Sequence, residues 1–140
     1  MNPDTEASNL SKLSLRILRD PIAPDFLTNL LGHAPSKGRK KGEQWTVAKT
    51  GEIHEARSGC WILNAPDSPT ADLDWQIAWI FGKLTEDLAA WKRTSEAHDV
   101  DIFVRLSPTI SNYGLEISAE TLDEMSLRGV KLTFDVQAPV

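Results

Sequence analysis

The chain has 140 residues, 41% of them hydrophobic and 25% charged, which is the balance of a single folded domain with one core. Its net charge of −5 disfavours general nucleic-acid binding, because a protein that coats phosphates needs a positive surface. With no signal-peptide pattern and no long apolar run, we expect a cytoplasmic protein without membrane contact, and the single cysteine excludes an internal disulfide.

The chain opens on polar residues, and residues 1–10 are predicted to form a flexible tail before one domain, residues 11–140. The first apolar segment, residues 13–18, alternates apolar and polar side chains, which is typical of a half-buried strand. Its apolar positions are Leu13, Leu15 and Ile17.

A helix is predicted next, over residues 24–31. Pro24 suits the first turn of a helix, and Gly32 suits the left-handed residue that ends one. The following segment, PSKGRKKGEQW at residues 35–45, contains one proline and two glycines and is predicted as a loop. It concentrates four basic side chains: Lys37, Arg39, Lys40 and Lys41.

Residues 44–64 are predicted to form a β-hairpin. The segments QWTVAK and GCWILN are rich in residues that favour strands, and Thr50-Gly51 and Ser58-Gly59 are turn signals between them. In the second strand, alternation places Trp61 and Leu63 on one face and Cys60 and Ile62 on the other.

The longest element is predicted as one helix over about residues 69–97, because Ser68 and Pro69 suit a helix cap and a first helical residue. Asp72 and Asp74 then lie where negative charge favours the helix dipole. Apolar residues recur at spacings of three and four and form one stripe: Leu73, Ile77, Ile80, Leu84, Leu88 and Trp91.

The last third of the chain predicts strands over residues 101–107 and 113–118, with turn residues Pro108, Ser111 and Asn112 between them. A short helix over residues 119–128 and a strand over residues 130–136 follow. The predicted order is βαββαββαβ. It corresponds to an α+β two-layer sandwich, with a mainly antiparallel sheet of about six strands and three helices packed on one side.

These segments occur in an order that resembles bacterial proteins grouped as domain of unknown function 4279. The segments concerned are LLGHAPSKGRKKGE, GCWILN, LDWQIAWIFGKL and YGLEISAETLDEMSLRGVKLTFDV. The resemblance extends from about Leu13 to Val136. It implies a single compact α+β domain and brings no activity, catalytic residue or cofactor.

The basic loop is one candidate site. Its four cations could contact an anion or an acidic partner, or they could form an ordinary solvated connection. The loop lacks the G-x-x-x-x-G-K-[ST] spacing and precedes a predicted strand, so it is not a nucleotide-binding loop.

Other chemistry-bearing residues give weaker signals. Cys60 lies beside Trp61 in a predicted strand, where a lone cysteine is usually a small buried hydrophobe rather than a nucleophile. His33, His54 and His98 are scattered and have no metal-ligand spacing. We therefore predict no catalytic residue, metal or cofactor.

The second candidate site is the back face of the predicted long helix. With Leu73 at zero on a helical wheel, Trp75 falls at about 200° and Trp79 at about 240°, with Gly82, Glu86 and Arg93 on the same side. Two tryptophans on that face would be costly to leave in water. They could pack under another segment of the chain, form a partner or dimer interface, or form a shelf for a small ligand.

Two functional hypotheses follow. The first is a non-catalytic protein-binding module, of the adaptor or toxin-neutralising (immunity) type, that binds another protein or a second copy through Trp75, Trp79 and Arg93. The alternative is a small enzyme or ligand-binding domain for a phosphorylated or carboxylated molecule, with the basic loop as its anion contact. Nothing in the pattern supplies an acid–base pair or a nucleophile, which favours the first hypothesis.

Overall fold

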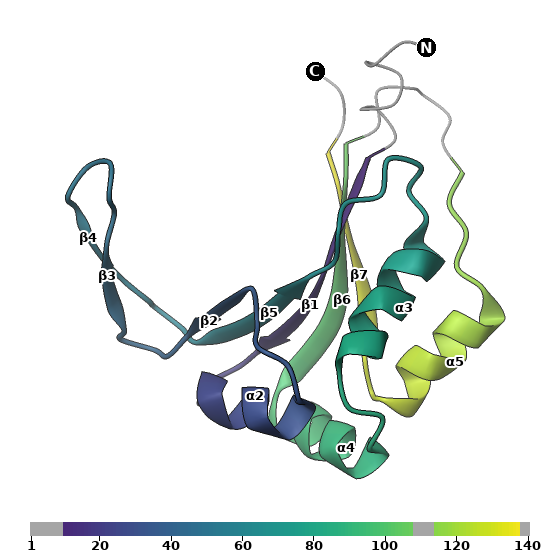
Figure 1. Cartoon of the computed structure of the whole chain (residues 1–140), viewed down its shortest axis with the longest axis horizontal. Coiled ribbons are helices and arrows are strands. Elements are labelled where there is room, and N and C mark those ends of the chain that lie inside the picture. The colour runs from purple at the N-terminus through teal and green to yellow at the C-terminus, as the bar shows by residue number, and fades with distance from the viewer. Residues whose placement is uncertain (1–9, 108–113, 138–140) are drawn as a thin grey trace.

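The computed structural model describes residues 10–107 and 114–137, which form a sheet with helices on one of its faces (Figure 1). The elements, in chain order, are β1 (Ser11–Leu18), α2 (Pro24–Leu31), β2 (Lys37–Arg39), β3 (Gln44–Thr46), β4 (Ile53–Glu55), β5 (Cys60–Asn64), α3 (Leu73–Lys83), α4 (Leu88–Ala97), β6 (Asp99–Leu106), α5 (Ala119–Leu127) and β7 (Lys131–Val136). None of these helices is long and apolar enough to cross a membrane.

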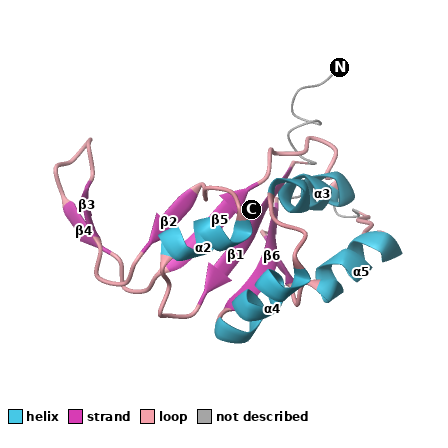
Figure 2. Ribbon diagram, turned by 60° about the horizontal axis from the view of Figure 1, so that its bottom comes forward, coloured by secondary structure: helices cyan, strands magenta, loops and turns pink. Residues whose placement is uncertain are grey.

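The main sheet has the strand order β2-β5-β1-β6-β7, and only its β6–β7 pair is parallel. All four described helices cover the same face of this sheet (Figure 2). Strands β3 and β4 form a separate two-stranded sheet that projects from the body. The predicted α+β two-layer sandwich is confirmed, with four described helices in place of the expected three.

The core lies between the sheet and the helices. Leu13, Leu15 and Ile17 are buried as the alternating pattern predicts, and Trp61 and Leu63 are buried on the same side of the sheet. Helix α2 begins with Pro24 and is capped at its end by Gly32, which has the expected left-handed backbone with φ of 87°. Local signals therefore placed these elements correctly.

The predicted hairpin over residues 44–64 pairs differently. Strand β3 pairs with β4, whereas β5 lies between β1 and β2 in the main sheet. The residues from Lys37 to Arg39, predicted as loop, form the edge strand β2. The helix side of β2 is Gly38, where an added Cβ would lie only 3.0 Å from Pro24. Glycine lets this strand approach α2 closely.

The helix predicted over residues 69–97 is two helices, because the chain becomes extended at Leu84. The backbone N–H of Thr85 donates a hydrogen bond of 2.8 Å to the carbonyl of Leu31, and the side chain of Asp87 caps the start of α4. As a result Leu88 is exposed rather than part of the core stripe, while Trp91 remains fully buried.

The strand predicted over residues 113–118 is not formed in its described part, residues 114–118. Leu115 and Ile117 still pack against the core on the way to α5. Tyr113 and the turn residues 108–112 lie outside the described residues, as does the predicted tail up to residue 9.

Candidate functional site

Helices α3 and α5 lie side by side and run in the same direction (Figures 1 and 2). At their starts, the backbone N–H of Ser118 donates a hydrogen bond of 3.0 Å to Asp74. At their ends, the guanidinium carbon of Arg128 lies 4.4 Å from the ring centroid of Phe81. These two contacts fix the spacing of the pair.

A groove of about 350 Å³ runs between the two helices. Ile77 and Phe81 of α3 contribute apolar side chains to it. The exposed residues Ala78 and Gly82 are small and leave open space on its α3 side. Three carboxylates stand around it: Glu86, Glu120 and Glu124.

Arg128 forms part of the floor of this groove and is only 6% exposed. It donates a hydrogen bond of 2.6 Å to the carboxylate of Glu124, and its guanidinium carbon lies 4.4 Å from the ring centroid of Phe81 and 5.8 Å from that of Trp91. Glu86 and Glu120, in contrast, form no ion pair with any described residue. The groove therefore has a floor of Ile77, Phe81 and the buried guanidinium of Arg128, and an acidic rim.

Trp75 of α3 is 48% exposed and does not itself line the groove. It precedes Ala78 by one helical turn and Gly82 by two, so the three residues form one ridge along α3. On the α5 side, Leu127 continues the ridge of Glu120 and Glu124 and is 53% exposed. Both ridges thus present a large apolar side chain to solvent.

Trp79, predicted to lie with Trp75 on the back face of the long helix, is partly buried and packs against the core. The ammonium of Lys83 lies 5.2 Å from its ring centroid and covers it further. The structure therefore separates the two tryptophans into an exposed side chain and one with a packing role.

Arg93, the third predicted partner contact, lies on α4 and not on the helix that carries the tryptophans. Its guanidinium carbon is 5.4 Å from the ring centroid of Phe26 on α2. The break at Leu84 removes the continuous helix on which the shared face was predicted.

The four cations of the basic loop are divided. Lys37 and Arg39 lie on β2, in register with Ile62 and Cys60 of β5. Lys40 and Lys41 instead line a separate open hollow of about 200 Å³.

Arg39 already has partners among the residues that follow β2. It donates a hydrogen bond of 2.8 Å to Glu43 and stacks on Trp45 at 4.2 Å. This hydrogen bond from Arg39 holds the pKa of Glu43 below its ordinary value. The loop therefore does not converge its four charges on one anion site.

The remaining candidates of the sequence are dispersed. Cys60 is half-buried in β5, His33 contacts the carbonyl of Ala34, His54 contacts Glu52, and His98 contacts the carbonyl of Arg19. Within the two described ranges, no group of three or more His, Cys, Asp or Glu side chains could hold a metal ion.

Sequence reasoning did not single out Glu120, Glu124 or Arg128. Their spacing of four residues is the signal that could have found them, because residues at that spacing share one side of a helix. It could not have shown that this side lies against α3.

Comparison with protein families matches residues 8–139 of the chain to the family described as "Domain of unknown function (DUF4279)". No curated protein and no solved structure matches the chain.

Proposed function

The chain belongs to the DUF4279 family, and we propose that it is a cytoplasmic, non-catalytic protein-binding domain whose α3–α5 face docks a basic protein. The observation that carries the proposal is the half-exposed Trp75, on the same α3 ridge as the groove residues Ala78 and Gly82, together with the acidic rim of that groove. Adaptors and proteins that neutralise a basic toxin are the two kinds of module that such a face suits.

Trp75 is the anchor of the proposed interface. Tryptophan is enriched among the few residues that supply most of the free energy of a protein interface. Ala78 and Gly82 follow it on the same ridge, and their small side chains leave room for a partner side chain in the groove. The expected partner segment therefore inserts an apolar side chain between α3 and α5.

The charge of the rim selects the partner. Glu86 and Glu120 are exposed carboxylates without an ion-pair partner in the described part of the chain, and Glu124 forms an ion pair with Arg128. A lysine or arginine next to the inserted apolar side chain would complement them. Complementary charge of this kind accelerates association and rejects acidic partners.

A second copy of the chain fits this face poorly. In a symmetric dimer the same patch meets itself, so the glutamates of one copy would face those of the other. Like charges brought together in an interface are costly. We therefore assign the face to a different, basic protein.

Photo-crosslinking in the source cells tests the proposal. A photoreactive amino acid at Ala78, on the α3 ridge, is expected to crosslink a basic protein, which mass spectrometry identifies. The control is the same amino acid at Lys131, which is exposed on β7 and points away from the helices. An acidic protein, a second copy of this chain, or equal capture from Lys131 would contradict the proposal.

A further inference from the structure

The face of the sheet opposite the helices is polar and carries most of the cations of the strands. Alternation and register place six cations on it: Lys12, Arg16, Lys37, Arg39, Arg105 and Lys131. Three strand carboxylates lie on the same face: Asp99, Asp101 and Asp135. These cations come from four strands that are distant in sequence. The chain, although acidic overall, therefore has a basic face.

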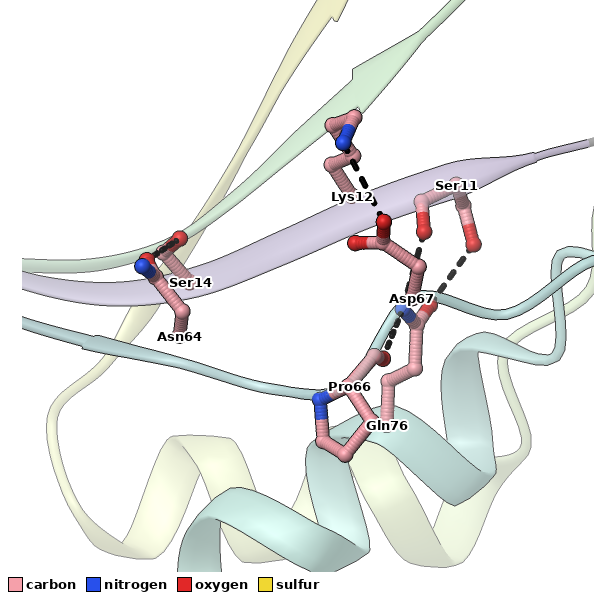
Figure 3. Close-up of polar contacts among 7 residues, drawn as sticks. All are labelled: Ser11, Lys12, Ser14, Asn64, Pro66, Asp67 and Gln76. Atoms are coloured by element: carbon pink, nitrogen blue, oxygen red, sulfur yellow. Dashed lines mark hydrogen bonds and ion pairs between the residues drawn. The ribbon is translucent and has the colours of Figure 1, made fainter. Parts of the chain in front are cut away.

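A cleft of about 410 Å³ opens on this face across β5, β1 and β6. Figure 3 shows two polar contacts made by residues of this cleft, one between Ser14 and Asn64 and one between Lys12 and Asp67. The hydroxyl of Ser14 donates to the side-chain carbonyl of Asn64 at 2.6 Å, and the ammonium of Lys12 lies 3.1 Å from the carboxylate of Asp67. Ile62 and Phe103 contribute apolar surface to the same cleft.

Two cations of the cleft stand directly opposite each other. Lys12 of β1 and Arg105 of β6 are cross-strand partners, and like charges in that position destabilise a sheet. Their own carboxylate partners lie outward on opposite sides: Asp67 in the loop after β5, and Asp135 on β7 at 3.3 Å from Arg105. All four side chains are well exposed, so neither ion pair compensates the opposition strongly.

Arg16 adds a third, rigidly held cation. Its Nε and Nη2 donate to Asp101 at 2.9 Å and 2.6 Å, and its guanidinium carbon lies 4.0 Å from the ring centroid of Phe103. Within residues 10–107 and 114–137, the Nη1 group makes no hydrogen bond. The hydrogen bonds from Arg16 to Asp101 also raise the pKa of Arg16, so its charge is fixed.

From this arrangement we propose that the cleft binds a small molecule that carries a carboxylate or phosphate group on an apolar body. Arg16 Nη1, the Nη groups of Arg105 and the ammonium of Lys12 are the donors to the oxyanion. Because Asn64 accepts from Ser14 through its carbonyl, its NH₂ group is a further donor. The side chains of Ile62 and Phe103 contact the apolar body.

NMR titration of the full chain tests this site with phenyl phosphate, benzoate and, as the uncharged control, benzyl alcohol. Either aromatic anion is expected to shift the amides of Ser14, Asn64 and Phe103 and to leave those of α3 and α5 unchanged. The anion that binds with the lower dissociation constant identifies phosphate or carboxylate as the preferred group. This readout is independent of the proposed docking of a protein on the helices.

The variant Arg105→Gln is expected to raise the dissociation constant about tenfold, the loss of one charged hydrogen bond. Lys131→Gln, which removes a cation of the same face outside the cleft, is expected to leave it unchanged. Equal weakening by both variants would mean diffuse attraction and overturn the proposal. So would the absence of shifts with both anions, or shifts produced only by a poly-glutamate peptide, which would make the cleft part of a protein interface.

Discussion

Replacing Gln76 with leucine is expected to lower the free energy of unfolding by about 3 kcal/mol, the cost of leaving buried polar groups without partners. Gln76 lies on α3, is fully buried and connects that helix to the start of β1 (Figure 3). Its carbonyl accepts a hydrogen bond of 2.7 Å from the hydroxyl of Ser11, and its amide donates at 3.0 Å to the carbonyls of Ser11 and Pro66.

Leucine has a similar volume, so the change removes the three hydrogen bonds without opening a large cavity. Unfolding in urea, followed by circular dichroism, measures the loss. Ser11→Ala is the matched control, because it removes one of the three bonds and should cost about 1 kcal/mol. Equal stability of Gln76→Leu and the native chain would show that this connection does not hold α3 on the sheet.

Replacing Asp101 with alanine is expected to cost a similar amount, about 3 kcal/mol, because it leaves the partly buried guanidinium of Arg16 without its counter-charge. The carboxylate is almost fully buried and accepts hydrogen bonds from Arg16 and, at 2.8 Å, from the hydroxyl of Thr133. It thereby joins β1, β6 and β7 across the open face of the sheet.

The control for this prediction is Asp135→Ala. Asp135 pairs with Arg105 on the same face, but both side chains are well exposed, and such pairs contribute less than about 1 kcal/mol. Thermal or urea unfolding of the two variants side by side measures the difference. If Asp101→Ala were as mild as Asp135→Ala, the buried pair would not position Arg16, and the proposed anion site would lose its fixed donor.

Local sequence signals predicted much of the fold. Alternation identified the buried face of β1, and Pro24 with Gly32 marked both ends of α2. Each of these features depends on neighbours in the chain. The break between α3 and α4 does not depend on chain neighbours. The apolar spacing continues through Leu84 and Leu88, but the backbone N–H of Thr85 donates to the carbonyl of Leu31, which is distant in the sequence.

The candidate site was predicted in part for the same reason. The helical wheel correctly placed Trp75 away from the core, but Trp79 is covered by packing and by Lys83 in three dimensions. The groove exists only because α5 lies against α3. The opposition of Lys12 and Arg105 is set by strand register, which no spacing in the sequence reveals.

The two layers of the domain thus carry opposite charges. The groove of the helix layer is rimmed by glutamates, whereas the open face of the sheet carries arginines and lysines. A basic protein docked on α3 and α5 would leave the cleft accessible on the far side of the sheet. An experiment that contradicts one of the two proposals therefore leaves the other unaffected.

The affinity of the crosslinked partner for Trp75→Ala tests the central claim most directly. Trp79 should be kept, because it packs on the core and its removal would confuse loss of binding with loss of folding. Isothermal titration calorimetry with a folded variant is expected to show binding weakened roughly 30-fold, as for truncation of an interface anchor. An unchanged dissociation constant would contradict the assignment of the α3–α5 face as the docking surface.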